Sequence, residues 1–408
     1  MNDDTFVDPV TRYLAYEGAY LAGDLDPGFE ALTAFECRFV TNSPALDTEL
    51  AWLRATMSNF RPDQIAHNES GGDPAWRYAS VVHTDVQYHD PQFKIASYTD
   101  IPAAGGECGP RAWFGRFARR AFGMPVWGVK QQGHAAMSTW SPEGWSTLLG
   151  AGWDHVWWDD QSGSDFNLET QSREYRGIFQ QVLRAQWAGS ALGEPPVDRS
   201  WTPRLPGKAY GQGGLWSALA LYLKKATIIT YGRPPTRRLQ KPVVQTKVAQ
   251  LVHTWSRKRA VEQIVTSKDG SIFIPASTAM LSRNAEVLPS FDAGLQLLHT
   301  GEWKDHPMDA AFEYHIDVPA TQTMQLVVNF TTWHIDQHLL FEAPNVSNAT
   351  RAVPVFRTGG WWNLTEPISV KLVAGMNILR FWRNDSRAMA FKNLVLRPVA
   401  VDMVVDEM

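Results

Sequence analysis

The chain has 408 residues, more than one ordinary hydrophobic core holds, so we expect two or three domains. Hydrophobic residues make up 44% and charged residues 20% of the sequence, which is typical of a globular protein. The formal net charge of −4 argues against a protein that binds nucleic acid or an anionic membrane through basic excess. Two cysteines, Cys37 and Cys108, are too few for a disulfide scaffold.

Residues 1–70 are predicted to form a helical segment that packs on the core. The stretches TRYLAYEGAYLAG and ALDTELAWLRATM repeat apolar residues at the period of an amphipathic helix. Cys37 lies in the apolar context ALTAFECRFV, which indicates a buried structural thiol. The polar and acidic start MNDDTFVDPV does not have the form of a signal peptide, and no apolar run is long enough to span a bilayer.

Residues 71–230 are expected to form the core domain. The stretch WRYASVVHTDVQYHD is rich in β-branched and aromatic residues and predicts a strand. After the loop TDIPAAGGECGP, apolar residues at helical spacing predict a helix from Arg111 to Phe122. Two further helices are expected, over about 168–189 and about 213–226.

The composition changes after the core domain. Residues 231–245 contain the basic, proline-bearing stretch GRPPTRRLQKP, which is typical of a linker. Strand-length runs such as DAAFEYHIDV and TMQLVVNFTTWHI then alternate with turn residues. This pattern predicts an antiparallel β-sandwich over residues 246–408.

Cys108 lies in a setting suited to a nucleophile. It follows two glycines and comes just before the predicted helix, so it lies at or beside the helix N-terminus. Unpaired backbone N–H groups at that end favour a thiolate and can hold a developing oxyanion. The glycines allow a substrate carbonyl to approach closely.

His134 is the predicted base for this thiol. It begins a predicted strand and has only small neighbours, Gly133, Ala135 and Ala136, which leave the imidazole accessible. A base of this kind also needs an acid that orients it. Asp154, Asp159 and Asp160 lie further along the chain, in and after the aromatic run WDHVWW.

These pieces together resemble the transglutaminase-like superfamily. The resemblance rests on a glycine-flanked cysteine before a helix that ends in Arg-Ala-Phe-Gly-Met-Pro, then a strand, Gly-His-Ala, and a strand ending in Gly-Trp. It covers about residues 75–160. The matching residues are Gly106, Cys108, Ala112, Phe114, Arg120, Ala121, Phe122, Gly123, Pro125, Gly133, His134, Gly144 and Trp145.

The resemblance implies an α+β fold in which a helix carrying the cysteine packs on an antiparallel sheet, as in papain. It also implies a Cys-His-Asp triad. The acid in this family usually follows Gly-Trp by about four residues, where this sequence has Leu149. An insertion must therefore bring another acid into place; we favour Asp159, with Asp154 as the alternative.

The C-terminal region, about residues 300–400, resembles carbohydrate-binding modules of the family-six kind. The resemblance rests on FEYHIDVPATQTMQLVVNF, VPVFRTGGWW and ISVKLVAGMNILRFW. Trp361 and Trp362 are candidates for stacking on sugar rings, and the alternative is a scaffold sandwich without a ligand. In the core, Trp113 and Gln131 are further candidate substrate-binding residues.

The expected function is therefore thiol-dependent acyl transfer. A peptidase, an amidase or a transglutaminase would all fit, with a peptide, amide or glycoconjugate substrate, and hydrolysis is favoured over amine transfer. This chemistry calls for no cofactor and no metal. The alternative is a decayed core that serves as a glycan- or protein-binding scaffold.

The sequence does not determine the localisation of the protein, but it slightly favours secretion or an extracellular location. That preference rests on N-x-S/T triplets, the pattern of N-glycosylation sites. They begin at Asn329, Asn345, Asn348, Asn363 and Asn384.

Overall fold

The computed structural model describes most of the chain as two compact units. The described residues are 7–60, 96–104, 108–131, 133–142, 144–147, 156–157, 163–195, 214–234, 247, 262–280, 285–290, 294–299, 311–333, 337–383 and 389–399. The first unit comprises Met1–Leu50, Arg77–Val82 and Gly106–Thr246. The second comprises Ala51–Trp76, His83–Gly105 and Lys247–Met408. The expected N-terminal segment 1–70 is thus shared between both units.

The first unit begins with short helices, and local sequence signals mark where these helices start. They are α1 (Pro9–Leu21), the 3₁₀ helix η1 (Pro27–Ala31) and α2 (Ala34–Thr41). Asp8 caps α1 by accepting a hydrogen bond from the backbone of Thr11, and Pro9 supplies the preset first-turn geometry. Thr33 and Glu36 form a capping box at the start of α2.

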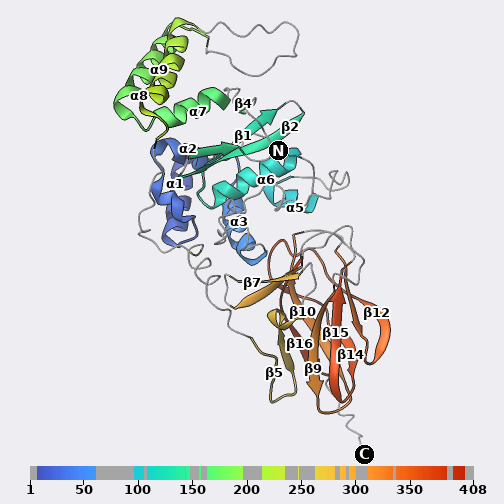
Figure 1. Cartoon of the computed structure of the whole chain (residues 1–408). Coiled ribbons are helices and arrows are strands. Elements are labelled where there is room, and N and C mark those ends of the chain that lie inside the picture. Colours follow the sequence, from blue (N-terminus) through green and yellow to red (C-terminus); the bar gives the residue numbers. More distant parts are fainter. Residues whose placement is uncertain are drawn as a thin grey trace, which may run out of the picture. The chain divides into compact units, whose positions relative to one another are not determined.

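A four-stranded antiparallel sheet forms the centre of the first unit, in the order β3-β2-β1-β4. Helix α6 packs on β1 and β2 (Figure 1). The other face of these strands is covered from α2 and α7, through Phe39 and Phe166. The elements are α6 (Cys108–Ala121), β1 (Val126–Gln131), β2 (His134–Ser141), β3 (Gly144–Thr147), β4 (Val156–Trp157) and α7 (Gly163–Ser172).

Helix α6 confirms the helix predicted from Arg111, although it begins three residues earlier, at Cys108. Its apolar face is fully buried, with Phe114 and Phe117 at most 1% exposed. Gly123 ends the turn after the helix with a φ of +77°. A side chain there would also place Cβ 2.7 Å from the ring of Phe29, so the position suits only glycine.

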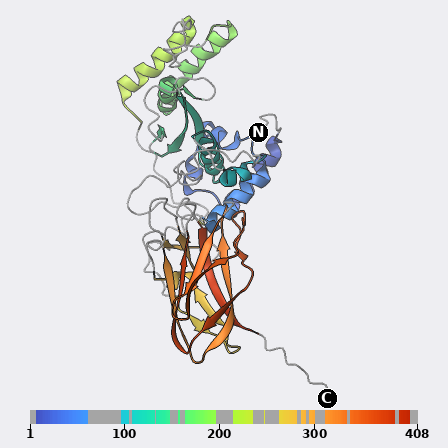
Figure 2. The ribbon, with the colours of Figure 1, turned by 90° about the vertical axis from the view of Figure 1, so that its right-hand side faces the viewer.

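One continuous helix was predicted over 168–189, and this was wrong, because the structure has two helices there. Helix α7 ends at Ser172, and α8 (Arg176–Ala191) begins after a turn. Helix α9 (Leu215–Tyr231) confirms the next predicted helix and ends just before Gly232, whose φ is +78°. Helices α8 and α9 lie side by side as an antiparallel pair in both views (Figures 1 and 2).

The second unit contains the predicted antiparallel β-sandwich. One sheet has eight strands, with β16 and β10 at its centre; the other has the order β12-β11-β15-β9. Side chains from both sheets meet in one apolar core, and β9 shows the alternating burial of a strand with one face inward. The strands are β5 (Val265–Thr266), β6 (Ile272–Pro275), β7 (Ala285–Pro289), β8 (Leu295–His299), β9 (Phe312–Val318), β10 (Gln322–Thr331), β11 (Leu339–Ala343), β12 (Ser347–Val353), β13 (Asn363–Leu364), β14 (Ile368–Leu372), β15 (Gly375–Trp382) and β16 (Met389–Pro398).

Segments from the N-terminal part of the chain complete this second unit. Helix α3 (Asp47–Phe60) contributes Trp52, whose ring centroid lies 5.6 Å from that of Trp333. The short helices η3 (Tyr98–Asp100) and α5 (Ile101–Ala104) also belong to it. Arg357 donates to the carbonyl oxygen of Thr99 at 3.0 Å. The sandwich is therefore built together with these helical pieces.

The expected strand around WRYASVVHTDVQYHD and most of the expected linker 231–245 lie outside the described residues. Within the described helices, none has the length and apolar character needed to cross a membrane.

Candidate functional site

Cys108 is the first residue of α6, as the position of a helix-terminal nucleophile requires. Its thiol is half-buried and forms no disulfide. It packs against a small cluster made of Ala112 on its own helix and of Val126 and Met137 on the sheet. Because helix and sheet are fixed against each other through this cluster, the position of Cys108 over the sheet is defined by packing.

His134 is the first residue of β2 and is also half-buried. It follows Gly133, which has a φ of +70°, and pairs across the hairpin with Gln131. The next residue, Ala135, packs against the same cluster as Cys108. His134 is therefore the chain neighbour of a residue that packs on the same cluster as Cys108.

Strand alternation determines which face of the sheet each residue meets. Ala135 and Met137 face α6, whereas Ala136 packs on the opposite side with Phe39 and Phe166. His134 has the parity of Ala136. A dyad with Cys108 therefore requires the imidazole to turn around the end of the strand, where His134 is the terminal residue.

The remaining core candidates are placed only in part. Asp154 and Asp159 lie outside the described residues, so the acid stays a prediction. Gln131 ends β1, and its backbone lies opposite His134. Trp113 is half-buried on α6, with the guanidinium of Arg116 4.5 Å from its ring centre. This cation–π contact gives Trp113 a structural partner within its own helix.

The two cysteines differ in their surroundings. Burial raises the pKa of the Cys37 thiol, and the neighbouring Glu36 carboxylate raises it further. Cys37 lies inside α2, whereas Cys108 lies at a helix N-terminus. Cys37 is thus the less suited of the two to react as a thiolate at neutral pH.

Trp361 and Trp362 belong to the second unit. They follow Gly359 and Gly360, both with positive φ, in the turn that leads to β13. The side chain of Trp361 is 47% exposed. Trp362 is half-buried, and the ammonium of Lys392 lies 5.9 Å from its ring centre. The structure therefore presents one of the two tryptophans at the surface.

A cavity of about 880 Å³ lies beside α1 and α2, and the sequence pattern did not predict it. Its wall includes Tyr13, Tyr16 and Tyr20, which share one face of α1. Their spacing of three and four residues was a usable signal, because aromatic residues repeated at that spacing line one side of a helix.

Comparisons with known proteins bear on the sandwich alone. No protein-family model and no curated protein matches the sequence. A family 35 carbohydrate-binding module from Clostridium thermocellum is 20% identical, with a TM-score of 0.26, over 31% of this chain and 97% of the module. The C-terminal family 6 module of LamC from Zobellia galactanivorans is 16% identical, with a TM-score of 0.25, over 31% and 98%. A module of lichenase 5A from Cellvibrio mixtus, solved with cellotriose, is 16% identical, with a TM-score of 0.26, over 31% and 96%.

Proposed function

We propose that this chain is a thiol-dependent acyl-transfer enzyme with a transglutaminase-like core. The observation that carries the proposal is the placement of Cys108 at the start of α6, packed on the cluster that also seats the residue after His134. The helix-on-antiparallel-sheet arrangement of α6, β1 and β2 agrees with this reading.

The proposed reaction begins with attack of the Cys108 sulfur on an amide or ester carbonyl carbon. His134 takes the thiol proton, and backbone N–H groups at the start of α6 stabilise the oxyanion. The carbon–nitrogen or carbon–oxygen bond then breaks, and His134 gives its proton to the leaving group. The product is a thioester on Cys108.

Water then resolves the thioester in the proposed hydrolytic cycle. His134 removes a proton from the water while the water oxygen bonds to the thioester carbon. The carbon–sulfur bond then breaks, the imidazolium returns its proton to the sulfur, and the acid product leaves. A primary amine in place of water would give transamidation instead. The substrate is a peptide, an amide or a glycoconjugate, and no cofactor takes part.

The third member of the triad is proposed to be Asp159, with Asp154 as the alternative. Its role is to orient the imidazole of His134 and stabilise the imidazolium. Asp154 precedes and Asp159 follows the short strand β4, which pairs with β1 at Val156–Lys130. Exchange of each acid for asparagine separates the two assignments, because only the orienting residue should lower turnover strongly.

The proposal is tested by turnover of a panel of peptide, amide and ester substrates. Cys108→Ala should abolish turnover and leave the fold intact, whereas the matched variant Cys37→Ala should keep it. His134→Ala should lower the rate by on the order of a thousandfold, as in other coupled triads. Near-normal activity of Cys108→Ala would overturn the mechanism.

A second candidate function is glycan binding by the sandwich. It is favoured by the exposed ring of Trp361, which lies beside the half-buried Trp362 in a glycine-bearing turn. Aromatic faces suit the C–H surface of a pyranose. Titration with oligosaccharides should show binding that Trp361→Ala removes. The exposed Phe356 gives the matched control, and equal loss in Phe356→Ala would contradict the assignment.

A further inference from the structure

The first unit contains a cavity that the proposed reaction does not use. It has a volume of about 880 Å³, within the range of small-molecule sites. It lies beside α1, η1 and α2, and its far rim is the segment that follows α2. The lining residues are Val7, Pro9, Arg12, Tyr13, Tyr16, Glu17, Tyr20, Phe29, Cys37, Arg38, Thr41, Asn42, Ser43 and Pro44.

Aromatic rings form the main wall of this cavity. Tyr16 stacks on Phe29 with ring centroids 6.4 Å apart and planes inclined by 11°. Tyr20 lies 6.1 Å from the same ring. Tyr13, one turn before Tyr16 on α1, is 62% exposed and extends the wall outward. Flat aromatic surfaces of this kind favour a flat ligand that can stack.

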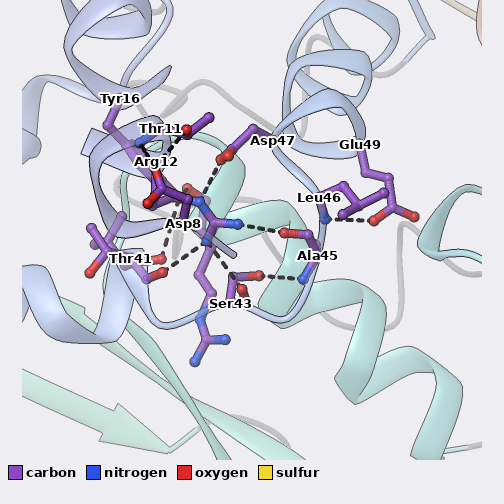
Figure 3. Close-up of polar contacts among 12 residues, drawn as sticks. Asp8, Thr11, Arg12, Tyr16, Thr41, Ser43, Ala45, Leu46, Asp47 and Glu49 are labelled. Carbon is purple, nitrogen blue, oxygen red and sulfur yellow. Dashed lines mark hydrogen bonds and ion pairs between the residues drawn. The ribbon is translucent and has the colours of Figure 1, made fainter. Parts of the chain in front are cut away.

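Arg12, the buried cation of the cavity wall, already has its ion-pair and hydrogen-bond partners within the protein. Arg12 is 4% exposed, and its guanidinium forms an ion pair with Asp47 (Figure 3). It also donates to the carbonyl oxygens of Thr41 at 2.8 Å, Ser43 at 3.1 Å and Ala45 at 2.6 Å. An anionic ligand would therefore have to compete with Asp47 for this cation.

Several other charged and polar groups of the wall also have partners within the protein. Tyr13 donates its hydroxyl to Glu17 at 3.0 Å, and this hydrogen bond raises the pKa of the phenol. Tyr16 donates to the carbonyl oxygen of Arg120 at 2.8 Å. The guanidinium of Arg38 lies over the ring of Phe39 at 4.6 Å. The charged groups Arg12, Glu17 and Arg38 thus each have a partner within the protein.

We propose that this cavity binds an uncharged, flat aromatic small molecule. A charged ligand would lose its hydration and would have to compete with the partners that Arg12, Glu17 and Arg38 already have within the protein, which is costly. An uncharged ring, in contrast, gains stacking on tyrosine and phenylalanine. The phenol oxygens, whose hydrogens point to protein acceptors, remain able to accept a hydrogen bond from a ligand hydroxyl. This inference does not rest on the acyl-transfer proposal.

Cys37 provides a reporter inside the site. It lines the cavity from α2, is half-buried and forms no disulfide. A ligand seated against the aromatic wall would cover its thiol. Alkylation of Cys37, measured in a Cys108→Ala protein so that one thiol remains, should therefore slow when the cavity is filled.

The experiment uses three probes that share the naphthalene ring on the full chain: naphthalen-2-ol, naphthalene-2-carboxylate and naphthalen-2-ylmethylammonium. Calorimetric titration should show naphthalen-2-ol binding at least about tenfold more tightly than either charged probe, and this probe should slow Cys37 alkylation. Tyr13→Ala should weaken binding by about tenfold, because it removes an exposed part of the wall. Leu14 is 56% exposed on the same helix but does not line the cavity. Leu14→Ala is therefore the matched control and should leave binding unchanged.

Three results would overturn the proposal. One is binding of a charged probe as tightly as naphthalen-2-ol. Another is an equal effect of Tyr13→Ala and Leu14→Ala on the affinity. The third is binding that appears only after removal of residues 1–6, since the occupant would then be the chain itself.

Discussion

At the scale of single residues, Arg12 shows how one side chain can define a local fold. Its guanidinium ties α1 to the segment that leads from α2 into α3, through Asp47 and three carbonyl oxygens. These carbonyl groups lie at or after the C-terminal end of α2, where the hydrogen bonds of the helix no longer supply a donor. Arginine, with five donors on a planar group, supplies them from a single position.

Replacement of Arg12 by methionine should lower the free energy of unfolding by about 3 kcal/mol, because it leaves buried carbonyls and Asp47 without their donor. Arg184→Met, at an exposed position of α8, should change it by less than about 0.5 kcal/mol. Denaturant unfolding measures both. Equal small effects would show that the Arg12 cluster contributes little to stability.

At the scale of elements, buried charges link α7 to α9, close to a break between α7 and α8 that the apolar periodicity did not predict. Lys224, 2% exposed, lies 3.0 Å from Asp165 and 2.9 Å from Glu169. Arg173 adds a second cation at 2.8 Å from Glu169. These ion pairs hold α7 against α9. Helix α7 ends at Ser172, and α8 begins at Arg176. Because no glycine or proline marks residues 173–175, periodicity alone predicted one continuous helix.

This cluster predicts a pH dependence of stability. Burial would raise the pKa of Glu169, but Lys224 and Arg173 outweigh it and hold the pKa below its ordinary value of 4.5. A lowered folded-state pKa means that the stabilisation is present above about pH 4.5 and is lost as the pH falls through the folded-state value. The unfolding free energy should therefore decrease on acidification below pH 4.5.

Glu169→Gln should lose about 3 kcal/mol at neutral pH, since it breaks a buried ion pair, and should show a flatter pH profile below pH 4.5. Chemical unfolding at a series of pH values, followed by circular dichroism, measures both quantities. Glu174→Gln, at an exposed position, is the control. An unchanged acid slope in Glu169→Gln would contradict the assignment.

Other elements followed from the sequence more directly. The glycines before Cys108, the apolar face of α6 and the small residues around His134 are local signals, so the helix and the hairpin could be predicted. The strands of the sandwich were readable because apolar residues alternate along them, as in β9. The cavity and the division of α3 between two units depend on contacts between distant segments, which periodicity does not reveal.

At the scale of the whole molecule, the sandwich is not built from the C-terminal half alone. The turn that carries Trp361 packs against α3: a Cβ on Gly360 would lie 2.0 Å from Nε1 of Trp333 and 2.5 Å from Cβ of Thr56. Arg357 joins the same region to η3. Truncation after residue 245 should therefore leave Trp52 and Thr56 without their partners and lower the melting temperature of the remaining chain.

Substitution of Gly359 and Gly360 by alanine distinguishes the cost of a positive φ from the cost of a steric overlap. Gly359→Ala should cost about 1 kcal/mol, because its φ is +65° and nothing lies within 4 Å. Gly360→Ala should cost clearly more, because the added Cβ also overlaps Trp333 and Thr56. Thermal unfolding of both variants measures the difference, and equal costs would show that α3 is not seated on this turn.

The central claim, that Cys108 and His134 act as a pair, is tested most directly by alkylation rates. Iodoacetamide labelling at pH 6, resolved by peptide mass spectrometry, gives the rates of Cys108 and Cys37 in one sample. Cys108 should react faster by on the order of a hundredfold, and His134→Ala should remove most of that advantage. Equal rates for the two cysteines, or a Cys108 rate that His134→Ala leaves unchanged, would contradict the account.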